Sequence, residues 1–267
     1  MLAFAGTDPS GGAGLQADVL TLAARGCHPL SVVTAITVQD TTGVAAVQAI
    51  AAGWVTDQAR RALADMRVSA IKIGLVGSAE NAAAIAAILA DHSDVPVVLD
   101  PVLASGRGDA LASADAVAAL CELLVPRATV LTPNSLEARR LAFAAERGPD
   151  ATGTLAEAAQ RLLARGAEYV LVTGTHEPTP QVINTLYGAH GMVRSDHWER
   201  LPGSYHGSGC TLAAAIAAGL ASGHAVAEAV RAAQRYVWQA LAQGFRPGAG
   251  QHIPDRLVGA QAAASAE

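Results

Sequence analysis

The sequence predicts an α/β fold: a three-layer α/β/α sandwich around a central, mostly parallel sheet. Short apolar runs alternate with longer helical patterns, which is typical of βαβ units. These runs lack polar alternation, which indicates strands buried on both faces, as in a parallel sheet covered by helices. Hydrophobic residues make up 51% of the chain but aromatics only 4%, so we expect alanine, valine and leucine to fill the core.

The expected elements alternate along the chain. The strands are residues 2–5, 31–38, 70–73, 95–99, 129–131 and 169–172. The helices are residues 13–24, 56–66, 79–90, 114–124, 155–164, 211–222 and 225–243. Residues 44–50 follow the turn 40–43 and are expected to extend or pair with the preceding strand. Residues 182–187 and 192–200, on either side of the turn 188–191, predict a small antiparallel hairpin at one edge of the sheet.

We expect residues 1–258 to form a single domain and residues 259–267 to be a flexible C-terminal tail.

The net charge is −5 and no basic face is visible, so no nucleic-acid partner is expected. Glycine, proline or charge interrupts each apolar segment well short of a membrane span, so no membrane partner is expected either. Three separated cysteines show neither metal spacing nor a disulfide framework, and no signal peptide is apparent, which favours the cytoplasm.

Residues 206–211 (HGSGCT) lead directly into an alanine-rich helix. Free N–H groups at a helix N-terminus, together with the helix macrodipole, bind anions without lysine or arginine. A cysteine at such a position is expected to have a lowered thiol pKa and to form a thiolate near neutral pH. An anion-binding turn with a base predicts phosphoryl transfer. The alternative is a glycine turn before a core helix, with Cys210 as a small buried filler.

Small or polar residues follow each expected strand. They are residues 6–12, 39–40, 74, 100–101, 132–134 and 173–176. Ligands of open parallel sheets bind beyond the carboxyl ends of the strands. Polar loops occur in any fold, but the chemical diversity of these groups favours a binding site along this rim.

Four polar residues at this rim have two interpretations each. Asn134 and Glu137 are spaced for a helix capping box, and the same oxygens could organise Mg²⁺ through water and substrate phosphates. These two roles can coexist. Asp18, four residues after Gly14, is expected to face the rim, unless it is a solvated helix charge. The amide of Gln39 could present a donor and an acceptor to a heterocycle, unless it is a surface residue.

Two common nucleotide-binding loops are missing from the sequence. The P-loop pattern G-x-x-x-x-G-K-[ST] does not occur, and residues 11–14 do not form the dinucleotide-binding pattern G-x-G-x-x-G. Six other segments match one family in order and spacing: AGTDPSGGAGLQADVLTLAARG (5–26), TAITVQDTTGV (34–44), IKIGLV (71–76), VVLDPVL (97–103), LTPNSLEA (131–138) and HGSGCTLAAAIAAGLA (206–221). On these segments the chain resembles the hydroxymethylpyrimidine/phosphomethylpyrimidine kinases of thiamine biosynthesis, in the ribokinase-like superfamily. The resemblance spans roughly residues 2–241.

The resemblance implies a ribokinase-like fold and ATP-dependent phosphorylation of 4-amino-5-hydroxymethyl-2-methylpyrimidine, and then of its monophosphate, with Mg²⁺. It also suggests a homodimer, across which apolar positions near 44–50 could pair. Cys210 would be the base, where most ribokinase-like kinases use Asp. Gly207, Ser208, Gly209 and the Cys210 amide would form the anion hole.

The resemblance also assigns the other site residues. The substrate would be surrounded by Gly6, Gly11, Gly12, Asp18, Gln39, Leu75 and Val102, with Asp18 and Gln39 holding the ring and its amino group. Nucleotide and phosphates would be contacted by Arg107, Asn134, Thr173, His206, Thr211 and Gln234. Mg²⁺ would be held by Asp100 and Glu137.

Three family lysines are replaced in this chain. Gly106 stands where a lysine is usual after the Asp-Pro pair, and we expect the adjacent Arg107 to take over phosphate contact. Residues 173–176 (TGTH) replace Lys-Gly-Gly-His. Gln234, with Arg235 adjacent, replaces a lysine of the last helix.

Three other functions stay open. A pyridoxal or pyridoxine kinase acts on a similar CH₂OH heterocycle, but such relatives tend to carry a cysteine after the Asp-Pro pair, and residues 102–110 contain none. A cysteine hydrolase would use Cys210 with His206 as its base, although no His–acid constellation can be read from the sequence. A non-catalytic regulator that binds the pyrimidine is the third.

Overall fold

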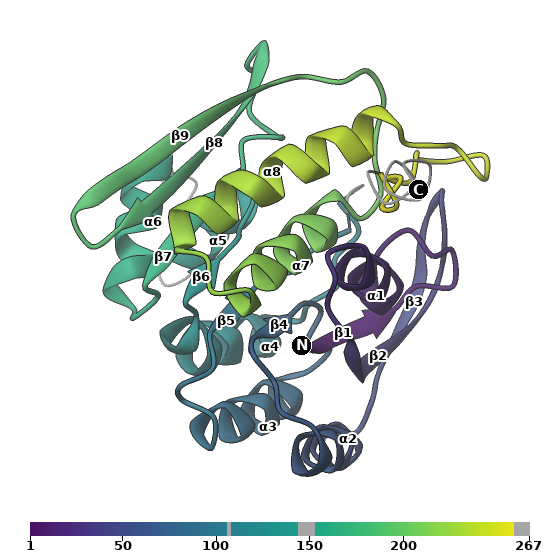
Figure 1. The fold of residues 1–267 in the computed structure, drawn as a ribbon, viewed down its shortest axis with the longest axis vertical. Helices are drawn as coiled ribbons and strands as arrows, with labels where there is room; N and C mark the ends of the chain where they lie inside the picture. The colour runs from purple at the N-terminus through teal and green to yellow at the C-terminus, as the bar shows by residue number, and fades with distance from the viewer. Residues whose placement is uncertain (106–107, 144–152, 259–267) are drawn as a thin grey trace, which may run out of the picture.

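The computed structural model describes residues 1–105, 108–143 and 153–258. In this part of the chain nine strands form one sheet, in the order β3-β2-β1-β4-β5-β6-β7-β8-β9 (Figure 1). The strands are β1 (Leu2–Thr7), β2 (Leu30–Asp40), β3 (Gly43–Ala49), β4 (Ile71–Ile73), β5 (Val97–Leu99), β6 (Val130–Leu131), β7 (Tyr169–Val172), β8 (Gln181–Gly188) and β9 (Gly191–Glu199). The strands from β2 to β7 in this order pair in parallel, while β3, β8 and β9 pair antiparallel at the edges. This confirms the predicted mostly parallel sheet.

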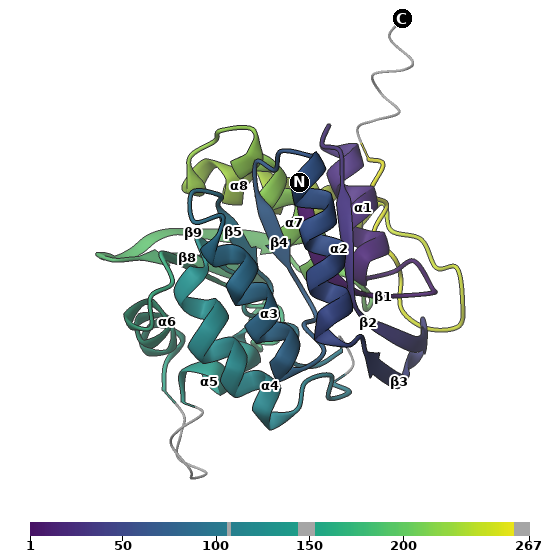
Figure 2. The same cartoon turned by 90° about the horizontal axis from the view of Figure 1, so that it is seen from below.

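Helices cover both faces of the sheet (Figure 2). One layer consists of α2 (Ala52–Asp65), α3 (Ala79–Ala90), α4 (Ala114–Ala119), α5 (Ser135–Ala142) and α6 (Leu155–Ala164). The other consists of α1 (Gly14–Ala24), α7 (Ser208–Ala221) and α8 (Val226–Ala242). Each layer packs on its own apolar cluster, so the predicted three-layer sandwich is confirmed.

Strand β1 shows why the strands read as apolar throughout. Leu2 and Phe4 belong to the core under α2 and α3, whereas Ala3 and Ala5 belong to the core under α1 and α7. Successive strand residues point to opposite faces, and here both faces are covered. The small Ala3 and Ala5 side chains therefore pack under α1 and α7, and the larger Leu2 and Phe4 side chains pack under α2 and α3.

Three predicted helices differ from the structure by more than one residue. Helix α7 begins at Ser208, three residues before the predicted start at position 211, because Gly207 already serves as its N-cap. Helix α5 was predicted only through its capping box, without bounds. Helix α2 begins at Ala52, four residues before the predicted start at position 56, because Val55 already packs into the core with no exposed surface. The predicted helix 114–124 is α4 followed by a π-helical turn (Leu120–Leu124), after which a short 3₁₀ turn (Val125–Arg127) leads to β6.

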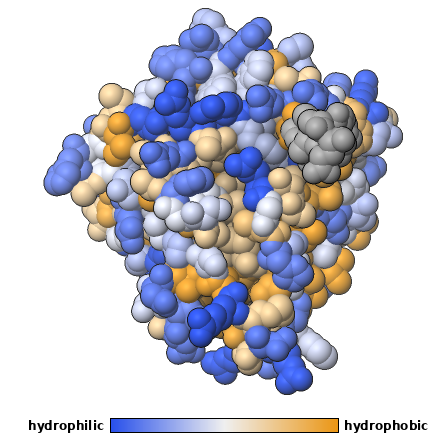
Figure 3. Space-filling model, viewed as in Figure 1, coloured by the Kyte–Doolittle hydropathy of each residue, from blue (hydrophilic) through white to orange (hydrophobic). Residues whose placement is uncertain are grey.

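The antiparallel hairpin predicted at one edge is confirmed as β8 and β9. Residues 44–50 form the edge strand β3 on the other side of the sheet, paired antiparallel with β2 as predicted. The predicted tail, 259–267, lies outside the described residues. None of the described helices is long and apolar enough to cross a membrane. Hydrophilic residues are interspersed with apolar ones over the face that carries α8 (Figure 3).

Candidate active site

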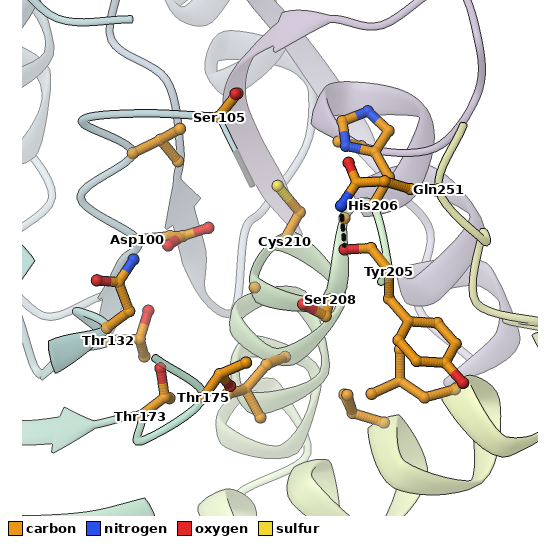
Figure 4. A pocket seen from close by; sticks show the side chains of 18 of the residues that line it. Asp100, Ser105, Thr132, Thr173, Thr175, Tyr205, His206, Ser208, Cys210 and Gln251 are labelled. Atoms are coloured by element: carbon orange, nitrogen blue, oxygen red, sulfur yellow. Dashed lines mark hydrogen bonds between the residues drawn. The ribbon is translucent and has the colours of Figure 1, made fainter. Parts of the chain in front are cut away.

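A cavity of about 1000 Å³ lies at the carboxyl ends of the parallel strands. Residues that end or follow six different strands line it: Gly6, Gln39, Leu75, Asp100, Thr132 and Thr173. Figure 4 shows Asp100, Thr132 and Thr173 on one side of the cavity, with Ser208 and Cys210 on the first turn of α7 beside them. The rim predicted from the strand ends therefore lines one shared cavity.

Helix α7 begins without a side-chain cap. Its N-cap residue, Gly207, has φ +80° and makes no side-chain cap hydrogen bond. A Cβ at this position would lie 1.8 Å from the carbonyl oxygen of Gly12, and its left-handed φ strains any residue but glycine. Gly207, Ser208, Gly209 and Cys210 all line the cavity. The helix thus brings its first-turn amides and the positive end of its dipole to the cavity wall, which is the arrangement that binds anions.

Buried side chains hold this turn against the loop after β1. Asp8 accepts hydrogen bonds from the amides of Ser10 (2.8 Å) and Ala13 (2.7 Å), and its Oδ2 lies 2.8 Å from His206 Nε2. Arg256, which is 3% exposed, donates to the carbonyl of Gly12 and to Thr211 Oγ1. Sequence reasoning missed both Asp8 and Arg256, because their partners lie on distant segments of the chain.

Cys210 lines the cavity and is partly exposed, so it is not a buried filler. Although the residue keeps some exposed surface, the dense packing around its thiol raises the pKa to about 12, against the lowering effect of the Lys72 ammonium. The predicted low thiol pKa is therefore wrong for the unliganded protein. Desolvation by the packed surroundings outweighs the helix N-terminus, and the thiol is neutral at pH 7.

Asp18 does not face the rim as predicted. It is fully buried outside the described cavity wall, and its Oδ2 accepts a hydrogen bond from Lys72 Nζ at 2.9 Å. Lys72 is also fully buried, but it lines the cavity together with Cys210 and Asp100. Burial alone would lower the pKa of Lys72, but the Asp18 charge raises it, so Lys72 keeps its ammonium. Burial raises the pKa of Asp18, and the Lys72 ammonium acts against that rise. A charged residue inside the apolar strand Ile71–Ile73 is the sequence signal that could have identified Lys72.

The predicted capping box on α5 is confirmed. The Asn134 side chain accepts hydrogen bonds from the amides of Leu136 and Glu137, and Glu137 Oε2 accepts one from the Asn134 amide at 3.0 Å. Glu137 Oε1 also accepts from the Leu103 amide at 3.2 Å. Asn134 and Glu137 nevertheless line the cavity, so capping does not remove them from the site.

Two neighbouring carboxyl groups in the cavity have raised pKa values. Burial raises the pKa of Asp100 to about 6. Burial and then the charge of Asp100 raise the pKa of Glu137 to about 8. Charge repulsion between the two groups, in surroundings that exclude water, is what a bound cation would relieve. No group of three or more His, Cys, Asp or Glu side chains suited to a metal occurs among the described residues.

The other predicted residues divide into two groups. Leu75, Val102, Thr173, His206 and Gln234 line the cavity. Three predicted residues do not line the cavity: Gly11, Gly12 and Thr211. The predicted substrate contacts of the two glycines are therefore corrected, and their carbonyls accept hydrogen bonds from Arg256 instead. The predicted phosphate contact of Thr211 is corrected as well, and its Oγ1 donates to the Gly207 carbonyl. Arg107 lies outside the described residues, and Arg235 is exposed, away from the described wall.

Sequence comparison points to one family. The profile of the family described as phosphomethylpyrimidine kinase matches residues 8–255. The hydroxymethylpyrimidine/phosphomethylpyrimidine kinase of Rhizobium meliloti is 42% identical over 250 residues, covering 94% of this chain and 93% of the relative. The enzyme of the same name from Streptomyces coelicolor is 41% identical over 254 residues, covering 94% and 91%.

Solved structures agree with this. An ADP complex of Bacillus subtilis pyridoxal kinase superposes with a TM-score of 0.85 at 29% identity, covering 96% of both chains. The phosphomethylpyrimidine kinase of Clostridium difficile superposes with a TM-score of 0.76 at 32% identity, covering 90% of this chain and 98% of that one. The fold is therefore ribokinase-like and the chemistry is that of a phosphotransferase, which replaces the hydrolase and regulator alternatives. The chain belongs to the phosphomethylpyrimidine kinase family.

Proposed function

We propose that this protein transfers the γ-phosphate of ATP to the hydroxymethyl group of 4-amino-5-hydroxymethyl-2-methylpyrimidine, and then phosphorylates the resulting monophosphate for thiamine biosynthesis. The uncapped start of α7 carries the proposal. Four consecutive residues at this start, Gly207–Cys210, line the cavity, so an anion-binding turn and a thiol lie side by side there. Phosphoryl transfer depends mainly on positioning and on stabilising charge, and such a turn supplies both.

The acceptor pyrimidine is assigned to the end of the cavity near β1, β2 and β4. Gly6, Gln39 and Leu75 line that end, and Val102 lies on the neighbouring loop after β5. The Gln39 amide can both donate to a ring nitrogen and accept from an amino group. The ATP phosphates are assigned to the turn before α7 and to Asn134 and Thr173, which line the cavity nearby.

The residues present fit Mg²⁺. Asp100 and Glu137 supply carboxylate oxygens to the cavity, and Mg²⁺ favours one or two carboxylates with water and substrate phosphates as its other ligands. When bound, Mg²⁺ would offset negative charge on the phosphates. Glu137 is held in place for this by its hydrogen bonds from Asn134 and Leu103.

Cys210 is proposed to accept the proton of the attacking hydroxyl, which requires its thiolate. The Lys72 ammonium acts in that direction, because it lowers the pKa of the thiol, although burial outweighs it. Asp18 fixes the Lys72 side chain by the 2.9 Å ion pair. The amides of the α7 turn would meanwhile stabilise charge on the transferring group, at a few kcal/mol for each well-placed donor.

Pyridoxal phosphorylation is the second candidate, because the Bacillus subtilis pyridoxal kinase superposes over 96% of the chain. ADP release with the hydroxymethylpyrimidine, its monophosphate, pyridoxal and pyridoxine separates the two functions. We expect kcat/KM to be at least about tenfold higher for the pyrimidine than for pyridoxal, since a ring-edge hydrogen bond discriminates strongly when unmet. Higher kcat/KM for pyridoxal would contradict the proposed substrate, and no ADP release with any of them would contradict kinase activity.

We also propose a homodimer. Strand β3 is an edge strand, and the neighbouring β2 exposes Ile36 (50%) and Val38 (60%). Exposed apolar residues beside an unpaired strand edge suit association with a second copy. Light scattering after size-exclusion chromatography should give twice the chain mass, and Val38→Lys should shift it toward the monomer. A monomer at micromolar concentration would refute this.

A further inference from the structure

Two tryptophans lie in contact in the cavity wall. They are toward the edge of the sheet formed by β8 and β9, whereas Gln39 is toward the opposite edge. Trp198 is on β9 and Trp238 is on α8, and both line the cavity. Their ring centroids lie 6.5 Å apart, with planes inclined by 28°. In the sheet, β8 and β9 form one edge and β2 lies near the other, while α7 packs on β4 and β5 between them. The anion-binding turn therefore separates the tryptophan end of the cavity from the Gln39 end.

Hydrogen bonds fix both indole rings and occupy their N–H groups. Trp198 Nε1 donates to Gln234 Oε1 at 2.9 Å, and Trp238 Nε1 donates to the Glu199 carbonyl at 3.2 Å. Gln234 is 3% exposed, and its Nε2 donates to Asp196 Oδ2 at 2.8 Å. Its Oε1 also accepts from Asn184 Nδ2 at 2.9 Å. The pair therefore offers ring surface to the cavity, because both of its N–H groups and the Gln234 amide oxygen are already bonded within the protein.

Gln234 occupies the position of the family lysine in the last helix, and in this chain its side chain orients the Trp198 ring. The two tryptophan rings, Trp198 and Trp238, are called the aromatic wall below. Gln234 sits one helical turn before Trp238, so one face of α8 carries both the ring and the amide that orients the other ring. The guanidinium of Arg200, which also lines the cavity, donates to the carbonyls of Thr175, Glu177 and Thr179. The Arg200 guanidinium, like the Gln234 amide oxygen, is thus bonded to the protein itself.

We propose that Trp198 and Trp238 form the surface on which the nucleobase of the phosphate donor stacks, and that they select the donor by ring area. This inference rests on the proposed kinase function. A base on this wall would point its phosphates toward the α7 turn, with the acceptor on the far side of that turn. Stacking tolerates any base, because each base has a π-face, and it favours purines because their rings are larger.

Tryptophan fluorescence tests the contact directly. The chain has three tryptophans, and the third, Trp54, is 70% exposed on α2 in the opposite helix layer. In Trp54→Phe protein, emission comes from the cavity pair alone. We expect ADP to change that emission saturably, with a Kd that agrees with calorimetry. Unchanged emission at an ADP concentration that saturates the calorimetric signal would overturn the proposal.

Variants of the pair measure its contribution. Trp198→Leu and Trp238→Leu should each weaken ADP binding about tenfold, whereas Trp198→Phe and Trp238→Phe, which keep an aromatic face, should stay within about threefold. KM for ATP should rise accordingly, while KM for the pyrimidine stays unchanged and serves as the folding control. Trp54→Leu is the matched control and should bind ADP like the parent. Leu variants with the parent Kd would show that the pair is packing only.

The choice of donor tests ring area. ADP and GDP should bind the parent protein within about threefold of each other, and UDP about tenfold more weakly. The gap to UDP should shrink in Trp238→Leu. GDP binding like UDP would overturn selection by area and indicate that the base edge is read.

Two outcomes separate this inference from the proposed function. If ATP is not turned over and no nucleotide binds the parent protein, the proposed function itself fails. Normal ATP turnover with unaffected Trp variants refutes this inference alone.

Discussion

Two helices, α5 and α7, start at the same cavity, and their first turns are built in opposite ways. Asn134 and Glu137 close a capping box on α5, so side chains and backbone satisfy one another. Helix α7 starts at Gly207 with no side chain over its first amides. A capped end is stable without a ligand, whereas an uncapped end leaves N–H groups that an anion can satisfy. From this contrast we infer that α5 forms a fixed wall of the cavity, and we propose that the start of α7 binds the transferring phosphoryl group.

The uncapped end has its own support, which lies behind the turn. The carbonyl of Gly12 packs against Gly207, and Arg256 binds that same carbonyl. The Asp8–His206 contact holds the residue before the turn. The turn is therefore positioned by groups that do not cover its amides. Four experiments test this comparison between α5 and α7.

Gly207→Ala should have the largest effect. The added methyl group would collide with the Gly12 carbonyl and strain a positive φ, so the turn must move. Since loss of one oxyanion donor costs about 10²–10³ in rate, displacement of the whole turn should lower kcat at least about 10³-fold. Gly223→Ala is the matched control: φ is +82° with nothing within 4 Å, so it should lose stability but keep activity. Equal kcat losses in the two variants would contradict a special role for the α7 start.

Cys210→Ser should slow the first phosphorylation about 10²–10³-fold and the second about tenfold or less. The hydroxymethyl group must lose a proton as it attacks, whereas the phosphate monoester is already an anion. Steady-state rates with each acceptor measure the difference. Cys27→Ser, at a partly exposed cysteine far from the cavity wall, should leave both rates unchanged. Equal losses on both acceptors would remove Cys210 as the base.

The pH dependence should separate the same two steps. Below a thiol pKa of about 12, the thiolate fraction of Cys210 rises with pH. Above about pH 9, Asp100 and Glu137, whose pKa values are about 6 and about 8, are largely deprotonated. From about pH 9 to about pH 10, kcat/KM for the hydroxymethyl acceptor should therefore rise up to about tenfold, whereas the rate with the phosphate acceptor should stay nearly flat. A plateau for the hydroxymethyl acceptor beginning near neutral pH would show that ligands lower the thiol pKa.

Asn134→Ala should have the smallest effect. Loss of the α5 cap should cost about 1 kcal/mol of unfolding free energy. Loss of the cap should also loosen the first turn of α5, on which Glu137 lies, although the backbone amides of residue 134 and Leu103 still donate to Glu137. Half-saturation by Mg²⁺ should therefore rise up to about tenfold. Thr154→Ala removes the equivalent cap of α6, which is away from the described cavity wall, and should cost similar stability with unchanged Mg²⁺ dependence. If both variants respond alike to Mg²⁺, the α5 box is structural only.

The sequence predicted elements best where local signals are strong. The ends of α6 coincide with the prediction for 155–164, since Thr154 and Glu157 cap the helix through neighbours in sequence. The glycine-rich turn before α7 was likewise readable, because its residues are consecutive in sequence, although the helix begins at Ser208 and not at the predicted position 211. The surroundings of Cys210 and Asp18 were not, because they depend on burial. The thiol pKa follows from packing by several elements, and Asp18 pairs with Lys72, 54 positions away.

The Asp8–His206 contact spans 198 positions, and the bond from Arg256 to Gly12 spans 244. Both braces of the α7 turn thus join the loop after β1 to residues far away in sequence. Contacts between distant residues form late in folding, because the entropy of closing the intervening loop must be lost first. The described sheet ends at Glu199, so all of its strands can pair before Arg256 reaches Gly12. On refolding, we therefore expect enzyme activity to recover after the secondary structure has formed.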